Sequence, residues 1–197
     1  PAEQVSGPVV VEETPEGTRA ALGEAMSRAD LVCVTGGVSV GRHDLVKQAL
    51  SDLGVEEVFW KVRLKPGKPI FLGRYEREEG RGGGRRGWVL GLPGNPVSAL
   101  VCLTRYVLPA IQQSLQANSN SNHEQVALAQ PLSFDAELSW FVPVTLEYAA
   151  DGRALATPRL TNTSGDFCAL SGTAGFIELP CEANDFPAGY VARLFRW

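Results

Sequence analysis

The sequence predicts an α/β fold, a layered and mostly parallel sheet with flanking helices that is N-terminally incomplete, followed by a small all-β domain. Helical and strand-like segments alternate as far as about residue 109, which is typical of a layered α/β domain. A polar stretch follows at 112–122, and beyond it only short alternating segments occur, separated by Pro, Gly and Asp-Gly turns. We therefore predict an α/β domain at 1–111, a linker at 112–122 and a β domain at 123–197.

The first segment is a capped helix over residues 15–29. Thr14 and Pro15 have the sequence of an N-cap followed by proline at the first helical position. The spacing of the apolar residues is helical: Leu22, Ala25, Met26 and Ala29. The apolar run at 31–34 then predicts a strand that is buried on both faces in a parallel sheet.

A second helix and two strands come next. An apolar stripe over 45–53 ends at Gly54 and predicts a helix with Asp44 at or next to its N-cap. Apolar residues at 58–62 and 70–72 predict strands on either side of a Lys-Pro-Gly-Lys-Pro turn. The arginine-rich and glycine-rich residues 80–87 are too polar to pack, so we expect a surface loop there.

The α/β half closes with a strand at 88–90 and a helix that begins at Asn95-Pro96 and presents one apolar face up to Leu108. The later segments predict a β barrel or sandwich. They lie at 126–128, 141–146, 154–156, 176–179 and 190–195.

The composition indicates which kinds of partner the protein could bind and where in the cell it is expected. The net charge of −4 disfavours a general nucleic-acid or membrane surface, since these bind through a net cationic field. The cysteines lack C-x-x-C spacing, so we predict reduced core or near-core residues rather than disulfides or a zinc site: Cys33, Cys102, Cys168 and Cys181. With no signal peptide or long apolar run, a cytoplasmic location is expected. Because the chain opens on Pro1, we expect a fragment of a longer protein.

Two loops and one turn have the residues of an anion site. In the loop 35–41, backbone N–H groups and two hydroxyls could face a ligand, or the glycines could only form a strand-to-helix turn; the candidates are Thr35, Gly36, Gly37 and Ser39. The loop 91–98 offers a close backbone approach, or a plain helix cap; its candidates are Pro93, Gly94, Asn95, Pro96 and Ser98.

Charged side chains complete the predicted site. Lys65 and Lys68 stand on a turn stiffened by Pro66 and Pro69 around Gly67, so they could act as point charges on an oxyanion or remain solvated. Asp44 could cap its helix, or it could be a Mg²⁺ ligand just past the anion loop. A single carboxylate does not make a metal site, so further ligands must come from elsewhere.

The ordered motifs Thr-Gly-Gly-Val-Ser-Val-Gly with Asp44 and Lys47, Lys-Pro-Gly-Lys-Pro, and Gly-Leu-Pro-Gly-Asn-Pro-Val-Ser resemble the molybdopterin molybdenumtransferases, bacterial MoeA and the gephyrin E domain. The resemblance covers residues from about 30 to 109. It implies Mg²⁺-dependent insertion of molybdate into adenylylated molybdopterin with release of AMP, by a homodimer. It assigns Asp44 to the metal and the two turn lysines to molybdate and phosphate, with the loop residues lining the cleft.

Two departures from the family pattern leave alternatives open. The N-terminal domains of the family are absent, so we expect the fragment alone to have little or no activity. The β domain reads Leu138-Ser139-Trp140-Phe141-Val142-Pro143, without the arginines of the family's Arg-x-x-Phe-x-Arg pattern. The alternatives are a molybdopterin adenylyltransferase-like enzyme, which shares the fold, and a non-catalytic gephyrin-like scaffold or binding module.

Overall fold

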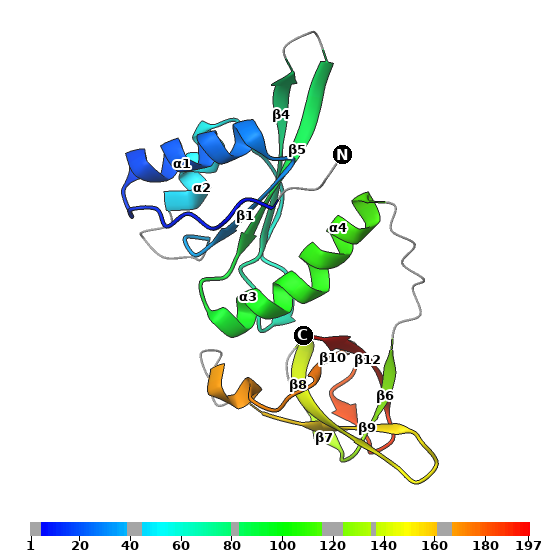
Figure 1. Cartoon of the computed structure of the whole chain (residues 1–197). Helices are drawn as coiled ribbons and strands as arrows, with labels where there is room; N and C mark the ends of the chain where they lie inside the picture. Colours follow the sequence, from blue (N-terminus) through cyan, green and yellow to red (C-terminus); the bar gives the residue numbers. More distant parts are fainter. Residues whose placement is uncertain (1–4, 39–44, 80–82, 116–123, 135–136, 161–166) are drawn as a thin grey trace.

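The computed structural model describes residues 5–38, 45–79, 83–115, 124–134, 137–160 and 167–197. Its first half contains helices and strands in alternation and its second half contains mainly strands (Figure 1). The first half comprises α1 (Pro15–Arg28), β1 (Leu31–Thr35), α2 (Leu45–Asp52), β2 (Glu56–Trp60), β3 (Leu64–Lys65), β4 (Phe71–Glu79), β5 (Gly83–Leu92), α3 (Pro96–Cys102), the π-helical turn η1 (Leu103–Val107) and α4 (Leu108–Ser114).

The sheet of the first half is mixed rather than mostly parallel. Its strand order is β1-β5-β4-β2. Only the β1–β5 pairing is parallel, whereas β5–β4 and β4–β2 are antiparallel. The expectation of a mostly parallel sheet was therefore only partly right. The physical reason is that β4 and β5 are joined by three residues, and so short a connection reverses the chain direction.

Helices cover both faces of this sheet. On one face α1 and α2 pack against the strands (Figure 1), and the buried residues there include Leu22, Leu50, Phe71 and Val89. On the other face the continuous α3–η1–α4 segment packs Cys102 and Val107 against Ile70, Leu90 and Leu92. The two layers of helix confirm the predicted layered architecture.

The predicted helix starts are present with their caps. The Thr14 side chain accepts a hydrogen bond from the Gly17 amide at 3.1 Å, with Pro15 at the first helical position. The Asn95 side chain accepts from the Ser98 amide at 3.2 Å and begins α3. The α3–η1–α4 segment runs on to Ser114, three residues into the stretch predicted as linker.

The arginine-rich segment is not a loop over its whole length. Residues 83–87 belong to β5, which pairs with β4 as far as Glu79. The arginines of this strand have acidic neighbours: Arg85 approaches the Asp30 carboxylate at 3.6 Å, and Arg86 approaches Glu76 of β4 at 3.9 Å. Because cross-strand pairs of opposite charge stabilise a sheet, polar residues can continue the strand on a solvated face. The prediction of a loop from low apolar content was therefore wrong for residues 83–87.

Cys33 corrects another expectation. Its strand was predicted to be buried on both faces, but Cys33 is exposed while its neighbour Val32 is buried. Successive side chains of a strand point to opposite faces, so Val32 joins the core under α1 and α2 while Cys33 points to the other face of β1. Cys102 is fully buried as predicted, whereas Cys168 is exposed and Cys181 is half-buried.

The second half is a closed barrel. The strand order β10-β12-β6-β9-β8, with an additional β10–β8 pairing, closes the sheet on itself, which decides between barrel and sandwich. Its core contains Val126, Val142, Ile177 and Leu194. The elements are β6 (Gln125–Leu128), β7 (Leu132–Ser133), β8 (Ser139–Tyr148), β9 (Ala154–Pro158), the 3₁₀ turn η2 (Phe167–Leu170), β10 (Gly175–Leu179), β11 (Asp185–Phe186) and β12 (Val191–Arg196).

The two halves share a sheet edge and a small core. The short strand β3 pairs in parallel with the start of β8, aligning Lys65 with Trp140. Val101 of α3 packs with Phe141 and Phe176 of the barrel. Arg105 of η1 also forms an ion pair with Glu178 of β10 at 3.1 Å. The turn that contains the predicted site lysines is thus anchored to the barrel.

Candidate anion-binding site

The two glycine-containing loops meet where the parallel strands β1 and β5 end. Thr35 aligns with Leu92 in the register, and the amide of Gly36 donates to the Leu92 carbonyl at 3.1 Å. The Thr35 hydroxyl donates to the Pro93 carbonyl at 3.2 Å. Neighbouring parallel strands with their carboxyl ends together are a common place for ligands in α/β sheets. The structure therefore brings together two of the three predicted motifs.

Glycine is required at this junction for two reasons. Gly36 and Gly37 have φ angles of +84° and +63°, which L side chains rarely adopt. A β-carbon on Gly94 would lie 3.3 Å from the Cα of Gly36. The loops are thus packed backbone against backbone.

The Lys-Pro-Gly-Lys-Pro turn packs against α3 beside these loops. Its ends are joined by hydrogen bonds from Val62 N–H to the Lys68 carbonyl and from Ile70 N–H to the Gly67 carbonyl. A β-carbon on Gly67 would lie 2.7 Å from the Sγ of Cys102. The third motif therefore adjoins the helix that follows the second one.

The two predicted lysines of the turn have different surroundings. Lys65 belongs to β3, and its Nζ lies 4.9 Å from the ring centroid of Phe134 in the barrel half. Phe134 in turn stacks on Trp140, with a centroid distance of 4.4 Å. Lys68 lies in the turn itself, and both lysines are exposed. The ammonium groups of Lys65 and Lys68 are thus both accessible to an anion from solvent.

Ser98 is less accessible to a ligand than its selection as a candidate binding residue suggested. The residue is buried, with 4% of its surface exposed. Its hydroxyl donates to the Asn95 side chain at 3.4 Å, to which its amide also donates. These contacts agree with the helix-cap interpretation that the sequence left open for this loop.

Ser39 and Asp44 lie outside the described residues, so their predicted roles stay predictions. Among the residues that the structure does describe, no three His, Cys, Asp or Glu side chains gather closely enough to hold a metal ion. The described residues therefore do not supply a Mg²⁺ site by themselves.

A tryptophan that sequence reasoning treated as ordinary packing lies beside the glycine loop. The indole N–H of Trp60 donates to the Val38 carbonyl at 3.0 Å. The ammonium groups of Lys47 and Lys61 lie 3.5 and 3.8 Å from the centre of its ring. The sequence signal available was the Trp-Lys pair at the end of β2.

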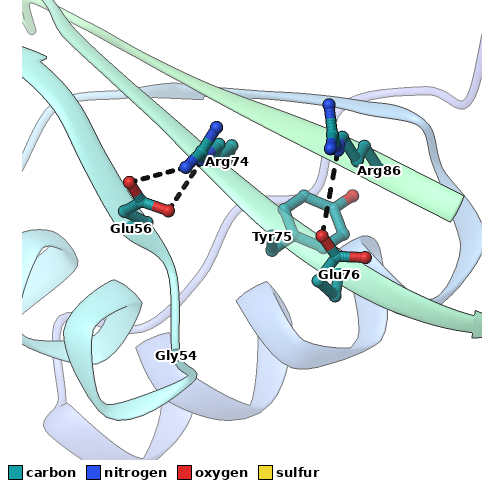
Figure 2. A pocket seen from close by; sticks show the side chains of 6 residues that line it. All are labelled: Gly54, Glu56, Arg74, Tyr75, Glu76 and Arg86. Carbon is teal, nitrogen blue, oxygen red and sulfur yellow. Dashed lines mark hydrogen bonds and ion pairs between the residues drawn. The ribbon is translucent and has the colours of Figure 1, made fainter. Parts of the chain in front are cut away.

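A separate pocket of about 140 Å³ lies farther along β4 (Figure 2). Its charges are already paired, Arg74 with both oxygens of Glu56 at 2.7 and 2.8 Å and Arg86 with Glu76 at 3.9 Å. The Tyr75 hydroxyl donates to the Ala29 carbonyl. With its cations compensated, this pocket is a weaker anion site than the loop junction.

The sequence matches the family model described as "Probable molybdopterin binding domain" over residues 3–113. It is 34% identical over 163 residues to a molybdopterin molybdenumtransferase of Synechocystis, covering 83% of this chain and 37% of that protein. It is 47% identical over 87 residues to one of Haemophilus influenzae, covering 44% and 19%. The Drosophila melanogaster molybdenum cofactor synthesis protein cinnamon is 29% identical over 190 residues, covering 94% and 30%.

Solved structures agree with the sequence matches. A molybdopterin biosynthesis MoeA protein from Pyrococcus horikoshii superposes with a TM-score of 0.71 at 25% identity, covering 94% of this chain and 42% of that one. The chain therefore belongs to the molybdopterin-binding domain family and, within it, to the molybdopterin molybdenumtransferase or MoeA group. It spans less than half the length of these relatives. In the described part of the chain, every helix is too short or too polar to cross a membrane.

Proposed function

We propose that the protein containing this chain inserts molybdate into adenylylated molybdopterin with release of AMP, in a Mg²⁺-dependent reaction of molybdenum cofactor biosynthesis. The observation that carries the proposal is the convergence of the three motif segments. The loop at 35–38, the turn at 65–69 and the loop at 92–95 meet around the start of α3. Proteins similar in sequence to this chain are named molybdopterin molybdenumtransferases.

The residues present suit charge stabilisation rather than covalent catalysis. Lys65 and Lys68 can place ammonium groups against oxyanions of phosphate or molybdate as oxygens exchange at molybdenum and the phosphoanhydride is cleaved. The glycines at 36, 37 and 94 allow the backbone to approach a phosphate closely. Mg²⁺ would neutralise phosphate charge, with Asp44 as its ligand from this chain. None of these roles needs a protein nucleophile.

Other parts of the proposal concern the whole protein. We propose a cytoplasmic homodimer whose cleft takes residues from both subunits, as the resemblance to the molybdopterin molybdenumtransferases implies. Further carboxylates would come from outside this chain. We also propose the domain division at 1–111, 112–122 and 123–197 that the sequence pattern predicts. The chain alone is expected to be inactive.

A non-catalytic binding module is the second candidate. The observation that favours it lies in the barrel segment beside the turn. Leu138 and Pro143 stand there at the positions of the two arginines in the family's Arg-x-x-Phe-x-Arg pattern. Lys65 lies beside this segment, over Phe134. A cleft with apolar residues there would bind phosphate through the lysines but hold molybdate weakly.

The test follows AMP release from adenylylated molybdopterin by the complete protein, with and without molybdate and Mg²⁺. The variants are Asp44→Ala and Lys68→Gln, and Asp52→Asn at the other end of α2 is the matched control. We expect molybdate-dependent release that falls at least about a hundredfold in Asp44→Ala, as for loss of an electrostatic contact in the transition state. Tight binding of the pterin nucleotide without any AMP release would instead establish the binding module.

A further inference from the structure

We propose that Phe134 of the barrel is a positioning residue for the anion site, because its ring holds the ammonium group of Lys65. The inference rests on the proposed function, in which Lys65 is one of two point charges on the Lys-Pro-Gly-Lys-Pro turn at 65–69 (the lysine turn). It gives the barrel a part in the site at a place where Leu138 and Pro143 replace the arginines of the family's pattern. The barrel thus acts on the ligand through a lysine of the first half of the chain.

The backbone of Lys65 is fixed by the barrel. Lys65 belongs to β3, which pairs in parallel with β8 and aligns Lys65 with Trp140. The connection continues on the N-terminal side, where the Ser139 amide donates to the Arg63 carbonyl at 2.9 Å. The Arg63 guanidinium donates in turn to the backbone carbonyl of Glu137 at 2.9 Å. The side chain of Lys65 therefore starts from a point that is tied to the barrel strand β8.

The ring of Phe134 is fixed to the same strand. The Phe134 amide donates to the Asn184 carbonyl at 2.8 Å, next to the β7–β11 pairing. The ring stacks on that of Trp140, with centroids 4.4 Å apart and planes 25° from parallel. Trp140 itself packs against the barrel core. Phe134 and Lys65 therefore share one support, which is Trp140 with its strand β8.

The ammonium group of Lys65 lies within the range of a cation–π contact. Its Nζ is 4.9 Å from the centroid of the Phe134 ring, and such contacts act up to about 6 Å. Lys65 is exposed, and an unrestrained lysine would sample many rotamers and lose that freedom on binding an anion. The ring restricts the side chain beforehand without neutralising its charge. Lys47 differs, because its ammonium group is paired with Glu57 at 3.0 Å.

The Lys65 contact also differs in reach from another lysine–ring contact. Lys61 meets the ring of Trp60, its neighbour in sequence, from a backbone with a φ angle of +64°. That contact is local, whereas the Lys65 contact joins the two halves. Lys68 lies on the lysine turn like Lys65, but none of the aromatic rings that the structure describes holds its ammonium group. Lys68 is therefore an internal control for the effect of Phe134.

The experiment is a titration of the chain, labelled with ¹³C-lysine, with inorganic pyrophosphate, which has the phosphoanhydride chemistry of a nucleotide. The chain has four lysines, so its four ε-methylene signals can be assigned by Lys→Gln variants, and the affinity is measured by calorimetry. The ring current of Phe134 should displace the Lys65 ε-proton signal, and the restraint should make its two ε-protons inequivalent. Phe134→Leu should abolish both effects and leave the Lys68 signal in place.

The affinity shows whether this restraint matters for binding. Phe134→Leu should weaken pyrophosphate binding about three- to fivefold, as expected for a cation–π contact at an exposed site. Phe134→Tyr retains a ring, so its affinity should stay within about twofold of the wild type. Tyr190→Leu is the matched control, because Tyr190 is another half-buried ring of the barrel, packed on Phe186 with centroids 5.0 Å apart. It should change the affinity less than about twofold.

A double-mutant cycle separates positioning from general support of the fold. Lys65→Gln removes the ammonium group that the ring holds, so adding Phe134→Leu to it should change the affinity less than about 1.5-fold. In the Lys68→Gln background Phe134→Leu should keep its full effect. A purely structural role of the ring would instead weaken binding equally in both backgrounds, and that result would overturn the inference.

The remaining outcomes separate this inference from the proposed function. If Lys65→Gln loses affinity while Phe134→Leu binds like the wild type, Phe134 only packs on Trp140; the inference then fails and the proposed function stands. If no lysine signal moves and neither Lys65→Gln nor Lys68→Gln weakens binding, the lysine turn is not an anion site. The proposed function then fails together with the inference.

Discussion

The thiol of Cys102 in α3 donates a hydrogen bond to the carbonyl oxygen of Gly67, with an Sγ–O distance of 3.9 Å. This contact joins the lysine turn to the helix that follows the second glycine-containing loop. Burial raises the pKa of the Cys102 thiol to about 12, because an ionised thiolate would lose its hydration there. Two predictions concern this contact.

Gly67→Ala should destabilise the protein. The new β-carbon would meet both Cys102 Sγ and Leu64 Cδ1 at 2.7 Å, with φ at +114°. Gly172→Ala is the matched control, because its φ is +76° but the space around it is open. In urea unfolding, Gly67→Ala should lose about 1–3 kcal/mol more than Gly172→Ala. Equal losses would show that α3 does not restrain the turn.

Cys102 should make stability fall in alkali. Below pH 9 the thiol is neutral in both states, so its contribution is fully present. Above pH 9.0, the ordinary thiol pKa, the unfolded chain ionises while the native thiol remains protonated up to a pKa of about 12. The resulting loss of unfolding free energy is about 1.4 kcal/mol at pH 10. Cys102→Ala should therefore reduce the fall in unfolding free energy between pH 8 and pH 10 by about 1.4 kcal/mol, and an unchanged fall would contradict the prediction.

The Arg105–Glu178 ion pair should couple the two halves energetically. Both side chains are 25% exposed, and two nitrogens of Arg105 reach the two oxygens of Glu178, at 3.1 and 3.4 Å. A double-mutant cycle with glutamine at each position should give a coupling of about 1–2 kcal/mol. Arg63 and Glu137 bridge the same halves with side chains 64% and 93% exposed. That control cycle should give less than about 0.5 kcal/mol.

Asn95 substitutions should separate capping from ligand binding. Asn95→Ala removes the acceptor for the Ser98 amide and should cost about 1 kcal/mol of unfolding free energy. Asn95→Asp retains the acceptor, so stability should hold, but its negative charge should weaken pyrophosphate binding about tenfold. Thr14→Ala removes the α1 cap and should lower stability without changing pyrophosphate affinity. Unchanged affinity in Asn95→Asp would place the ligand elsewhere.

The sequence predicted best what is decided locally. Thr14-Pro15 and Asn95-Pro96 each combine a side-chain acceptor with a preset φ, so the helix starts follow from four or five residues. The meeting of the loops after β1 and β5 follows from their parallel pairing, which the alternation of elements implied. Gly36 and Gly37 have the positive φ angles that glycine accommodates in such a turn.

What depends on distant partners was not predictable. Cys33 has apolar neighbours in sequence, yet it is exposed because it points to the face of β1 opposite the core under α1 and α2. Arg85 continues a strand because Asp30, far away in sequence, balances its charge. The contacts of Lys65 with Phe134 and of Lys61 with Trp60 depend on tertiary packing and on one unusual backbone angle.

The pairing of β3 with β8 has a consequence for thermal unfolding. Because the strand Leu64–Lys65 lies in the first half of the chain but hydrogen-bonds to the barrel, melting either half would remove partners from the other. Two domains joined only by a linker would give two separate heat-capacity peaks. This chain should instead melt as one calorimetric unit, with equal van't Hoff and calorimetric enthalpies, and the lysine turn would lose its shape in that same step.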